Sequence, residues 1–171
     1  YPTPQKSLTK APKGKTPFYI SHYARHGSRF LINPDKYIKT LETLQKAYEE
    51  GKLTSKGCEV LKKVRMMCAE SNNRYGELTA LGAEQHRGIA RRMYERFPEV
   101  FKGNGNIDAK PTVVIRCILS MENELQELIS INPKLSITHD ASEHDMYYMN
   151  YDDTNLGSKR KNDATKAYMD K

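Results

Sequence analysis

The sequence predicts an α/β fold, with a mostly parallel sheet, flanking helices and an additional block of helices. Apolar runs of strand length lie at residues 17–24 and 112–119, and a shorter run lies at 135–139. Helical patterns separate these runs, and strands that alternate with helices are typical of parallel sheets. Sheets of this class usually have about five or six strands. Either further strands are present, therefore, or these residues are part of a larger protein.

The 171 residues are enough to bury one hydrophobic core, so we expect a single domain over 1–171. Residues 1–16, rich in Pro, Lys and Thr, are expected to form an irregular leader. The α/β core is expected at 17–32 and 112–139, and the helical block at 35–98. No apolar run is long enough to cross a bilayer, which predicts a soluble protein.

Four stretches carry apolar residues at helical spacing, at 33–51, 54–70, 80–97 and 122–131. The first begins with a capping Asn33 and a helix-initiating Pro34, and it stops at Gly51. Thr79 supplies the capping side chain of the third. Residues 35–98, which lie between the apolar runs 17–24 and 112–119, are therefore predicted to form a block of helices.

The excess positive charge is concentrated near the amino end. The formal net charge is +7, and residues 1–34 contain six basic residues and no acidic one. The six are Lys6, Lys10, Lys13, Lys15, Arg25 and Arg29. A local basic field of this kind concentrates an anionic small molecule, whereas a nucleic-acid binder spreads its charge along a face. We therefore expect a small anionic ligand and no nucleic-acid partner.

The motif Arg25-His26-Gly27-Ser28-Arg29 follows directly after the apolar run 17–24. It places a histidine between two arginines, whose planar guanidinium groups pair with phosphate oxygens and stay charged. The neighbouring cations lower the pKa of His26 and so keep its imidazole neutral and nucleophilic. Gly27 allows a sharp turn and close approach of a substrate. This pattern predicts chemistry on a phosphate monoester.

Three segments resemble the histidine acid phosphatases. Tyr23–Arg29 is similar to the Arg-His-Gly-x-Arg signature of that family, and Gly76–Gln85 is similar to its second signature. Residues 110–121 resemble the family's strand that supplies a further phosphate-binding arginine, here Arg116. The first motif contains Ser28, and the third reads Arg-Cys-Ile-Leu-Ser-Met. In these details the sequence most resembles the multiple inositol-polyphosphate phosphatase branch of the family.

This resemblance covers about residues 17–150 and implies part of a histidine phosphatase fold, which is phosphoglycerate-mutase-like. It implies that His26 becomes transiently phosphorylated, that Arg25 and Arg29 clamp the phosphate, and that Arg116 is a further clamp. Water then hydrolyses the phosphohistidine, so the resemblance implies no metal and no other cofactor. The implied substrates are phytate and related inositol phosphates, and the implied location is secreted or periplasmic.

The chain departs from the family pattern in two places. The family has two arginines on the third segment, separated by a short spacer, whereas here Arg116 is followed at once by Cys117. The family's proton donor lies far downstream, and the chain ends before any such position, which predicts an incomplete N-terminal portion. The alternatives are a broad-specificity histidine acid phosphatase and a non-catalytic phosphate-binding remnant.

Two His-Asp pairs, at His139 and His144, have the residue types of a proton donor or of a metal site. Their position is too early for the family's donor, and their spacing matches no recognised metal motif, so a loop or capping role is the alternative. The three cysteines are Cys58, Cys68 and Cys117. Their spacing predicts neither a disulfide framework nor a zinc site.

Three further features have both a structural and a functional interpretation. His22 either orients the site or is a core histidine. The segment 85–87, Gln-His-Arg, is expected to be a solvated helix face and is otherwise part of the site. The methionine and tyrosine run at 146–151 is expected to be a packed core edge, with a substrate pocket as the alternative.

Overall fold

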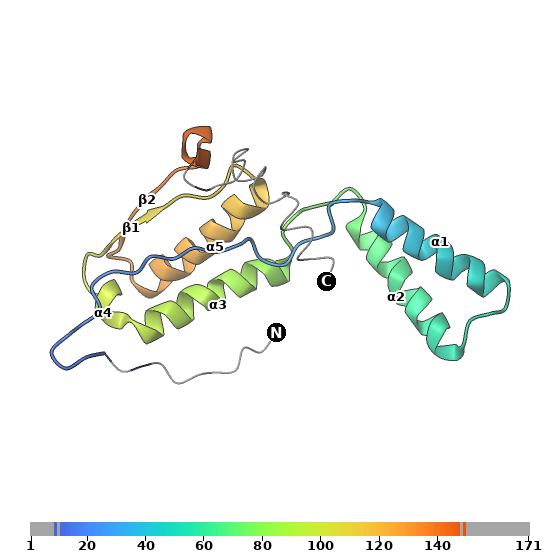
Figure 1. Cartoon of the computed structure of the whole chain (residues 1–171), viewed down its shortest axis with the longest axis horizontal. Helices are drawn as coiled ribbons and strands as arrows, with labels where there is room; N and C mark the ends of the chain where they lie inside the picture. Colours follow the sequence, from blue (N-terminus) through green and yellow to red (C-terminus); the bar gives the residue numbers. More distant parts are fainter. Residues whose placement is uncertain (1–8, 10, 148, 150–171) are drawn as a thin grey trace, which may run out of the picture.

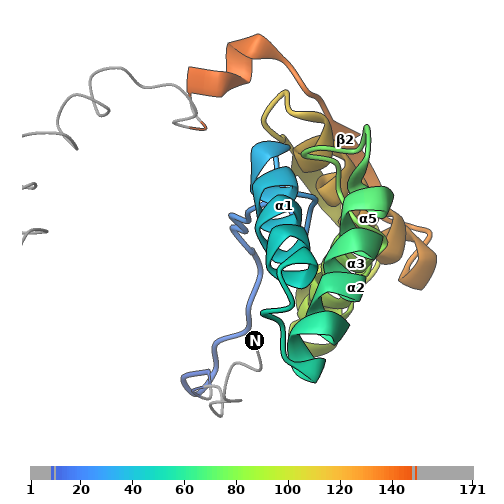
Figure 2. The ribbon, with the colours of Figure 1, turned by 90° about the vertical axis from the view of Figure 1, so that its right-hand side faces the viewer.

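The structure is a computed structural model that describes residues 9, 11–147 and 149. Its elements are α1 (Asp35–Glu49), α2 (Ser55–Ser71), α3 (Ala80–Arg96), α4 (Pro98–Phe101), β1 (Asn106–Ala109), α5 (Ile115–Ile131), β2 (Ser136–His139) and the 3-10 helix η1 (Glu143–Tyr147). At one end α1 and α2 form a helical hairpin, and at the other α3 and α5 lie beside the two strands (Figure 1). The view along the long axis shows α1 and α2 side by side (Figure 2).

The helices α1, α2 and α3 confirm the predictions made for these segments, and local signals explain where they begin. Thr54 and Thr79 each accept a hydrogen bond from the backbone N–H three residues on, at 3.1 Å. The Asn33 side chain accepts one from the backbone N–H of Asp35 at 2.9 Å. In the described part of the chain, no helix is both long and apolar enough to span a membrane.

The main hydrophobic core lies between α3, α5 and the short helix α4. Its buried residues are Ala90, Phe101, Leu128 and Leu135, with Ile20, Met93, Tyr94, Val100 and Ile107 packed around them. Tyr94 stacks on Phe101 with 5.5 Å between the ring centroids. Because α3 and α5 share this core, residues carried by the two helices have fixed relative positions.

The sheet consists of two parallel strands in the described residues, with Asn106 opposite Ser136 and Ala109 opposite His139. The strand expected at 135–139 is therefore confirmed, together with the expected parallel pairing. The strand β1 was not predicted, because its four residues, Asn-Ile-Asp-Ala, include only one with a strong strand preference. The result is a small parallel sheet in a helix-rich α/β fold.

The strand expected at 17–24 is wrong, because these residues form an extended segment without regular structure. Phe18, Tyr19 and Tyr23 are 91%, 71% and 83% exposed, whereas Ile20 packs against the core. A strand needs a neighbour for its backbone N–H and C=O groups. Among the residues that the structure describes, β1 and β2 pair only with each other, and no segment pairs with 17–24.

The strand expected at 112–119 is also wrong, because α5 begins at Ile115 and continues to Ile131. The adjacent β-branched Val113 and Val114 favour a strand locally. From there on, however, the buried residues Ser120, Glu124 and Leu128 recur every four positions, which is the spacing of a helix face. Packing of this face against α3 outweighs the local preference, and it places Arg116 in the first turn of α5.

Candidate active site

The motif residues 25–29, here called the His26 loop, cross the beginning of α3. The backbone N–H and the hydroxyl of Thr79 both donate to the carbonyl oxygen of Ser28, each at 2.9 Å. The side-chain oxygen of Gln85 accepts a hydrogen bond from the backbone N–H of Ser28, also at 2.9 Å. The first two family-like motifs of the sequence thus meet in one hydrogen-bonded unit.

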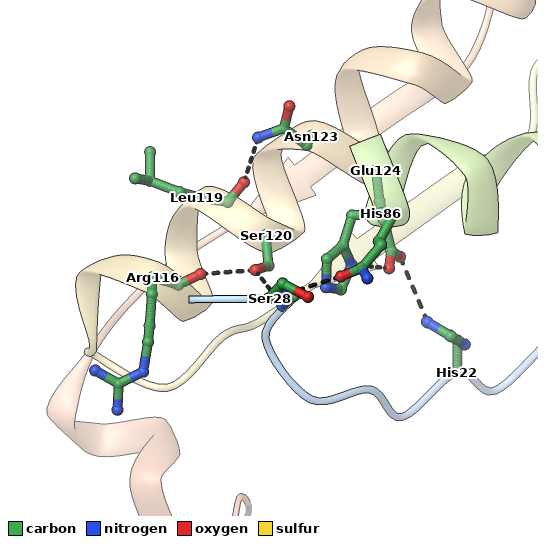
Figure 3. A network of polar contacts seen from close by, with 10 residues as sticks. His22, Ser28, His86, Arg116, Leu119, Ser120, Asn123 and Glu124 are labelled. Carbon is green, nitrogen blue, oxygen red and sulfur yellow. Dashed lines mark hydrogen bonds and ion pairs between the residues drawn. The ribbon is translucent and has the colours of Figure 1, made fainter. Parts of the chain in front are cut away.

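The His26 loop is also attached to α5 through Ser120, which is buried. The Ser120 hydroxyl accepts a hydrogen bond from the backbone N–H of Gly27 at 3.1 Å and donates to the carbonyl oxygen of Arg116 at 2.7 Å (Figure 3). The third motif therefore contacts the first through a residue that the sequence did not single out. Two helices that share one core fix the position of the loop.

Two glycines allow the His26 loop to lie directly on α3. A Cβ atom on Gly27 would lie 2.7 Å from the Cα atom of Gly82, and a Cβ on Gly82 would lie 2.9 Å from the backbone nitrogen of Ser28. Both distances are shorter than a van der Waals contact, so neither position has room for a side chain. The glycines of the two motifs are explained by this mutual approach of two backbones.

His26 is half-buried, and its ring orientation is set by its own loop. Its Nδ1 lies 2.8 Å from the carbonyl oxygen of Gly27. Because a carbonyl can only accept, Nδ1 carries the hydrogen, and the lone pair of the neutral ring is on Nε2. Burial lowers the pKa of His26, and the charges of Arg116, Arg25 and Arg29 lower it further, against the opposing effect of the Gly27 carbonyl. The ring is therefore kept neutral and able to attack through Nε2.

Three arginines surround this histidine without a protein anion to balance them. Arg25 is exposed, and Arg29 and Arg116 are partly buried. Within the described residues, none of the three forms an ion pair with a carboxylate. The Nε atoms of Arg29 and Arg116 are buried and have no hydrogen-bond partner. Guanidinium groups without a carboxylate partner favour an anionic ligand, because the oxygens of such a ligand can accept the hydrogen bonds that these N–H groups lack.

Substitution of Arg116 by Gln is expected to raise the pKa of His26. The positive charge of Arg116 disfavours the imidazolium form, so its removal shifts the titration upward, toward 6.5, and reduces the neutral fraction of His26 in mild acid. An NMR titration of the His26 ring measures this directly. Arg91→Gln, which removes a charge paired with Glu127, is the control and should leave the titration unchanged. A downward or absent shift in Arg116→Gln would contradict the electrostatic role of Arg116.

A recess of about 340 Å³ opens beside the His26 loop. Its lining includes Arg25, His26 and Gly27 from the loop, and Gln85, His86 and Arg92 from α3. Small-molecule sites have volumes of roughly 300–1,000 Å³, so the recess has room for a small ligand. In this place a ligand would contact the histidine and at least two arginines.

The segment 85–87 is only partly the solvated face that the sequence predicts. Arg87 does lie at the surface, where its Nη1 is 2.6 Å from Glu84 Oε1. Gln85 instead holds the His26 loop, and His86 is buried, with an exposed fraction of 3%. Gln85 is exposed, as expected, although it also contacts the loop. For His86 the expectation was wrong, because its side chain is buried against Glu124 of α5.

His86 pairs with the buried carboxylate of Glu124, a residue that the sequence reasoning missed. The His86 Nδ1 lies 2.5 Å from one carboxylate oxygen of Glu124, and the His22 Nε2 lies 3.4 Å from the other (Figure 3). His22 is therefore not a core histidine, since it lies at the surface and faces Glu124. An acidic residue on the helix face that carries Leu125 and Leu128 is the signal that identifies this contact.

We expect Glu124→Gln to lower the free energy of unfolding by about 1–2 kcal/mol, because a hydrogen bond to a charged group is replaced by one to an amide. Urea denaturation gives this difference. The control is Glu122→Gln, which alters an ion pair with His139 that is half-exposed and should change stability by less than about 1 kcal/mol. Equal effects of the two substitutions would show that burial of Glu124 has no energetic consequence.

The remaining candidates lie outside the recess. The Nδ1 of His139 is 2.6 Å from Glu122 Oε1, and His144 lines a separate hollow with Lys110 and Asp145. Across 11–147, the structure places no three His, Cys, Asp or Glu side chains where they could hold a metal ion. In the run 146–151, Met146 is buried, which agrees with a packed edge, and residues 148, 150 and 151 lie outside the described part of the chain.

The three cysteines are free thiols, as the sequence predicts. Cys58 and Cys68 lie on α2, and Cys117 lies in the first turn of α5. Cys117 is partly buried.

Comparison with solved structures finds the multiple inositol polyphosphate phosphatase of Bifidobacterium longum. Its complex with inositol hexasulfate is 31% identical to the chain, with a TM-score of 0.58, and the match covers 75% of this chain and 27% of that one. For the complex with phosphate the values are 31%, 0.60, 75% and 26%, and for the apo form they are 30%, 0.61, 75% and 26%. No family model and no curated protein matches the chain.

This similarity confirms the predicted relationship to the histidine phosphatases, and with it the partial α/β fold of that family. The chain spans about a quarter of the length of the solved chains that it matches. The relationship that three short motifs predict is thus also found in the backbone arrangement of three quarters of the chain.

Proposed function

We propose that this chain, as a member of the histidine phosphatase family, binds a phosphate monoester at the His26 loop and accepts its phosphoryl group on Nε2 of His26. One observation carries the proposal. A neutral histidine with its Nε2 lone pair available lies among three arginines that have no carboxylate partner in the described residues. A phosphate monoester supplies the negative charge that these arginines lack and the electrophile that the histidine requires.

In the proposed reaction, Arg25, Arg29 and Arg116 hold the phosphate oxygens, and Nε2 of His26 attacks phosphorus. The P–N bond forms as the P–O bond to the leaving alcohol breaks, and the alcohol takes a proton from an acid. Water then attacks phosphorus, the P–N bond breaks, and inorganic phosphate leaves as His26 returns to its neutral form. The protein supplies charge neutralisation and a positioned nucleophile.

We propose inositol polyphosphates, phytate among them, as the substrates. The solved relatives are named inositol polyphosphate phosphatases, and one of them holds inositol hexasulfate. In this chain, the basic residues of 11–34 and the unpaired arginines of the site favour a ligand with dense negative charge. A less selective phosphatase would not need charge beyond the loop that binds one phosphate.

A second function, phosphate binding without turnover, is favoured by one observation. Among the described residues that line the recess, the only carboxylate is Glu84, and it is held by Arg87. If no acid protonates the leaving alcohol, the chain binds phosphate and does not transfer it.

Brief incubation of the chain with uniformly ³²P-labelled inositol hexakisphosphate, followed by denaturation, tests the proposal. The expected result is a covalent label that is stable in base and lost in acid, as a phosphohistidine is. Calorimetric titration with inorganic phosphate is the companion measurement. Binding without a label supports the non-catalytic alternative, and absence of both binding and label would overturn the proposed function.

A further inference from the structure

Arg92 lies on the face of α3 that points toward the recess, and a glycine gives its side chain room. Arg92 follows Gln85 by seven residues, which places the two on one stripe of the helix and roughly 10 Å apart along its axis. A Cβ atom on Gly88 would lie 3.0 Å from Nη1 of Arg92 and 3.9 Å from its Cζ. The guanidinium group therefore lies back over Gly88, in the direction of Gln85, which binds the His26 loop.

The charge of Arg92 is not balanced by the described part of the protein, whereas the charges of its neighbours are. Arg91 lies 2.7 Å from Glu127, and Arg87 lies 2.6 Å from Glu84. Arg92 is exposed, lines the recess and forms no ion pair with any described residue. Because Glu84 is already held by Arg87, the recess retains the charge of Arg92 together with that of Arg25.

We propose that Arg92 binds a second phosphate group, and that the site thereby selects small molecules that carry at least two phosphates. The inference rests on the proposed function, because it assumes that the first phosphate lies at the His26 loop. A ligand with one phosphate is neutralised by the arginines of the loop and gains nothing from a cation two helical turns away. A ligand with several phosphates spans the recess and brings a second anionic group to Arg92, where a guanidinium binds it in two hydrogen bonds.

Calorimetric titration of the full chain with two probes tests this inference. Inositol hexasulfate is the polyanion, since it has no phosphoryl group to transfer, and inorganic phosphate is the single anion. We expect Arg92→Gln to weaken hexasulfate binding at least about tenfold, because the two hydrogen bonds of the guanidinium to a charged group are lost, and to leave phosphate binding within about twofold.

The matched control is Arg91→Gln, which makes the same change of charge at the adjacent position of the same helix. Because Arg91 faces Glu127, this variant should bind both probes within about twofold of the parent. A second variant, Gly88→Ala, keeps Arg92 but displaces its guanidinium group from its position over residue 88. It should weaken hexasulfate binding by less than Arg92→Gln does, and it should not affect phosphate.

The outcomes separate this inference from the proposed function. If the parent binds both probes and Arg92→Gln changes neither affinity, or changes both by the amount seen in Arg91→Gln, the second phosphate site is wrong and the proposed function stands. If the parent binds neither probe, the proposed function fails and the inference fails with it. A loss confined to hexasulfate in Arg92→Gln supports both.

Discussion

His26→Ala is expected to abolish the acid-labile label that labelled inositol hexakisphosphate leaves on the chain. The side chain that would carry the phosphoryl group is gone, and none of the arginines can replace a nucleophile. Removal of a catalytic nucleophile lowers turnover on the order of 10⁴-fold or more, so phosphate release should fall to the background rate. Because His26 is only half-buried, the folded structure should persist, which circular dichroism can establish.

His139→Ala is the control for this experiment. The side chain of His139 is hydrogen-bonded to Glu122 and does not line the recess, so the label should remain at the parental level. This variant also addresses the sequence-based alternative of a proton donor at His139. A label that survives in His26→Ala, or disappears only in His139→Ala, would remove His26 from its assigned role.

Gly82→Ala is expected to lower the free energy of unfolding by about 3 kcal/mol and to weaken phosphate binding. The added methyl group would meet the backbone of Ser28, which cannot rotate away as a side chain can. Overpacking of this kind typically costs about 1–3 kcal/mol, and here the loop can escape only by giving up its hydrogen bonds to Thr79 and Gln85. Urea denaturation and phosphate titration measure the two effects.

Gly88→Ala provides the comparison for stability, since it makes the same substitution six residues later in the same helix. Its added methyl group meets only the movable end of Arg92, and alanine stabilises a helix interior by up to about 1 kcal/mol relative to glycine. The difference between the two variants therefore isolates the contact between two backbones. If both variants have the same stability, the close approach of the loop to α3 is not a structural requirement.

Features that depend on neighbouring residues in the sequence could be predicted. The capping side chains of Thr54 and Thr79 and the spacing of apolar residues locate α2 and α3. The motif at 25–29 predicts a candidate nucleophile from the types of residues beside it, and that role stays a prediction. In each case the signal lies within a short stretch of the sequence.

Features that depend on distant partners could not be predicted. The apolar run 17–24 has the composition of a strand, but a strand exists only where another segment pairs with it. Residues 115–119 have strand-like side chains, yet the helix is decided by the contact of Ser120, Glu124 and Leu128 with α3. His86 was expected at the surface for the same reason, because the residues near it in the sequence give no sign of its contact with Glu124 of α5.

The connection between the α1–α2 hairpin and the rest of the molecule has a further consequence. The chain enters the hairpin just after the His26 loop and leaves it just before Thr79, and entry and exit are joined by Phe30 N–H to the Glu77 carbonyl at 3.0 Å and by Gly76 N–H to the Leu31 carbonyl at 3.2 Å. The hairpin is thus an insertion with its two ends fastened together. Since the entropy of closing a loop grows only slowly with its length, the insertion can lengthen, shorten or change its sequence while the His26 loop and the start of α3 at its base keep their geometry.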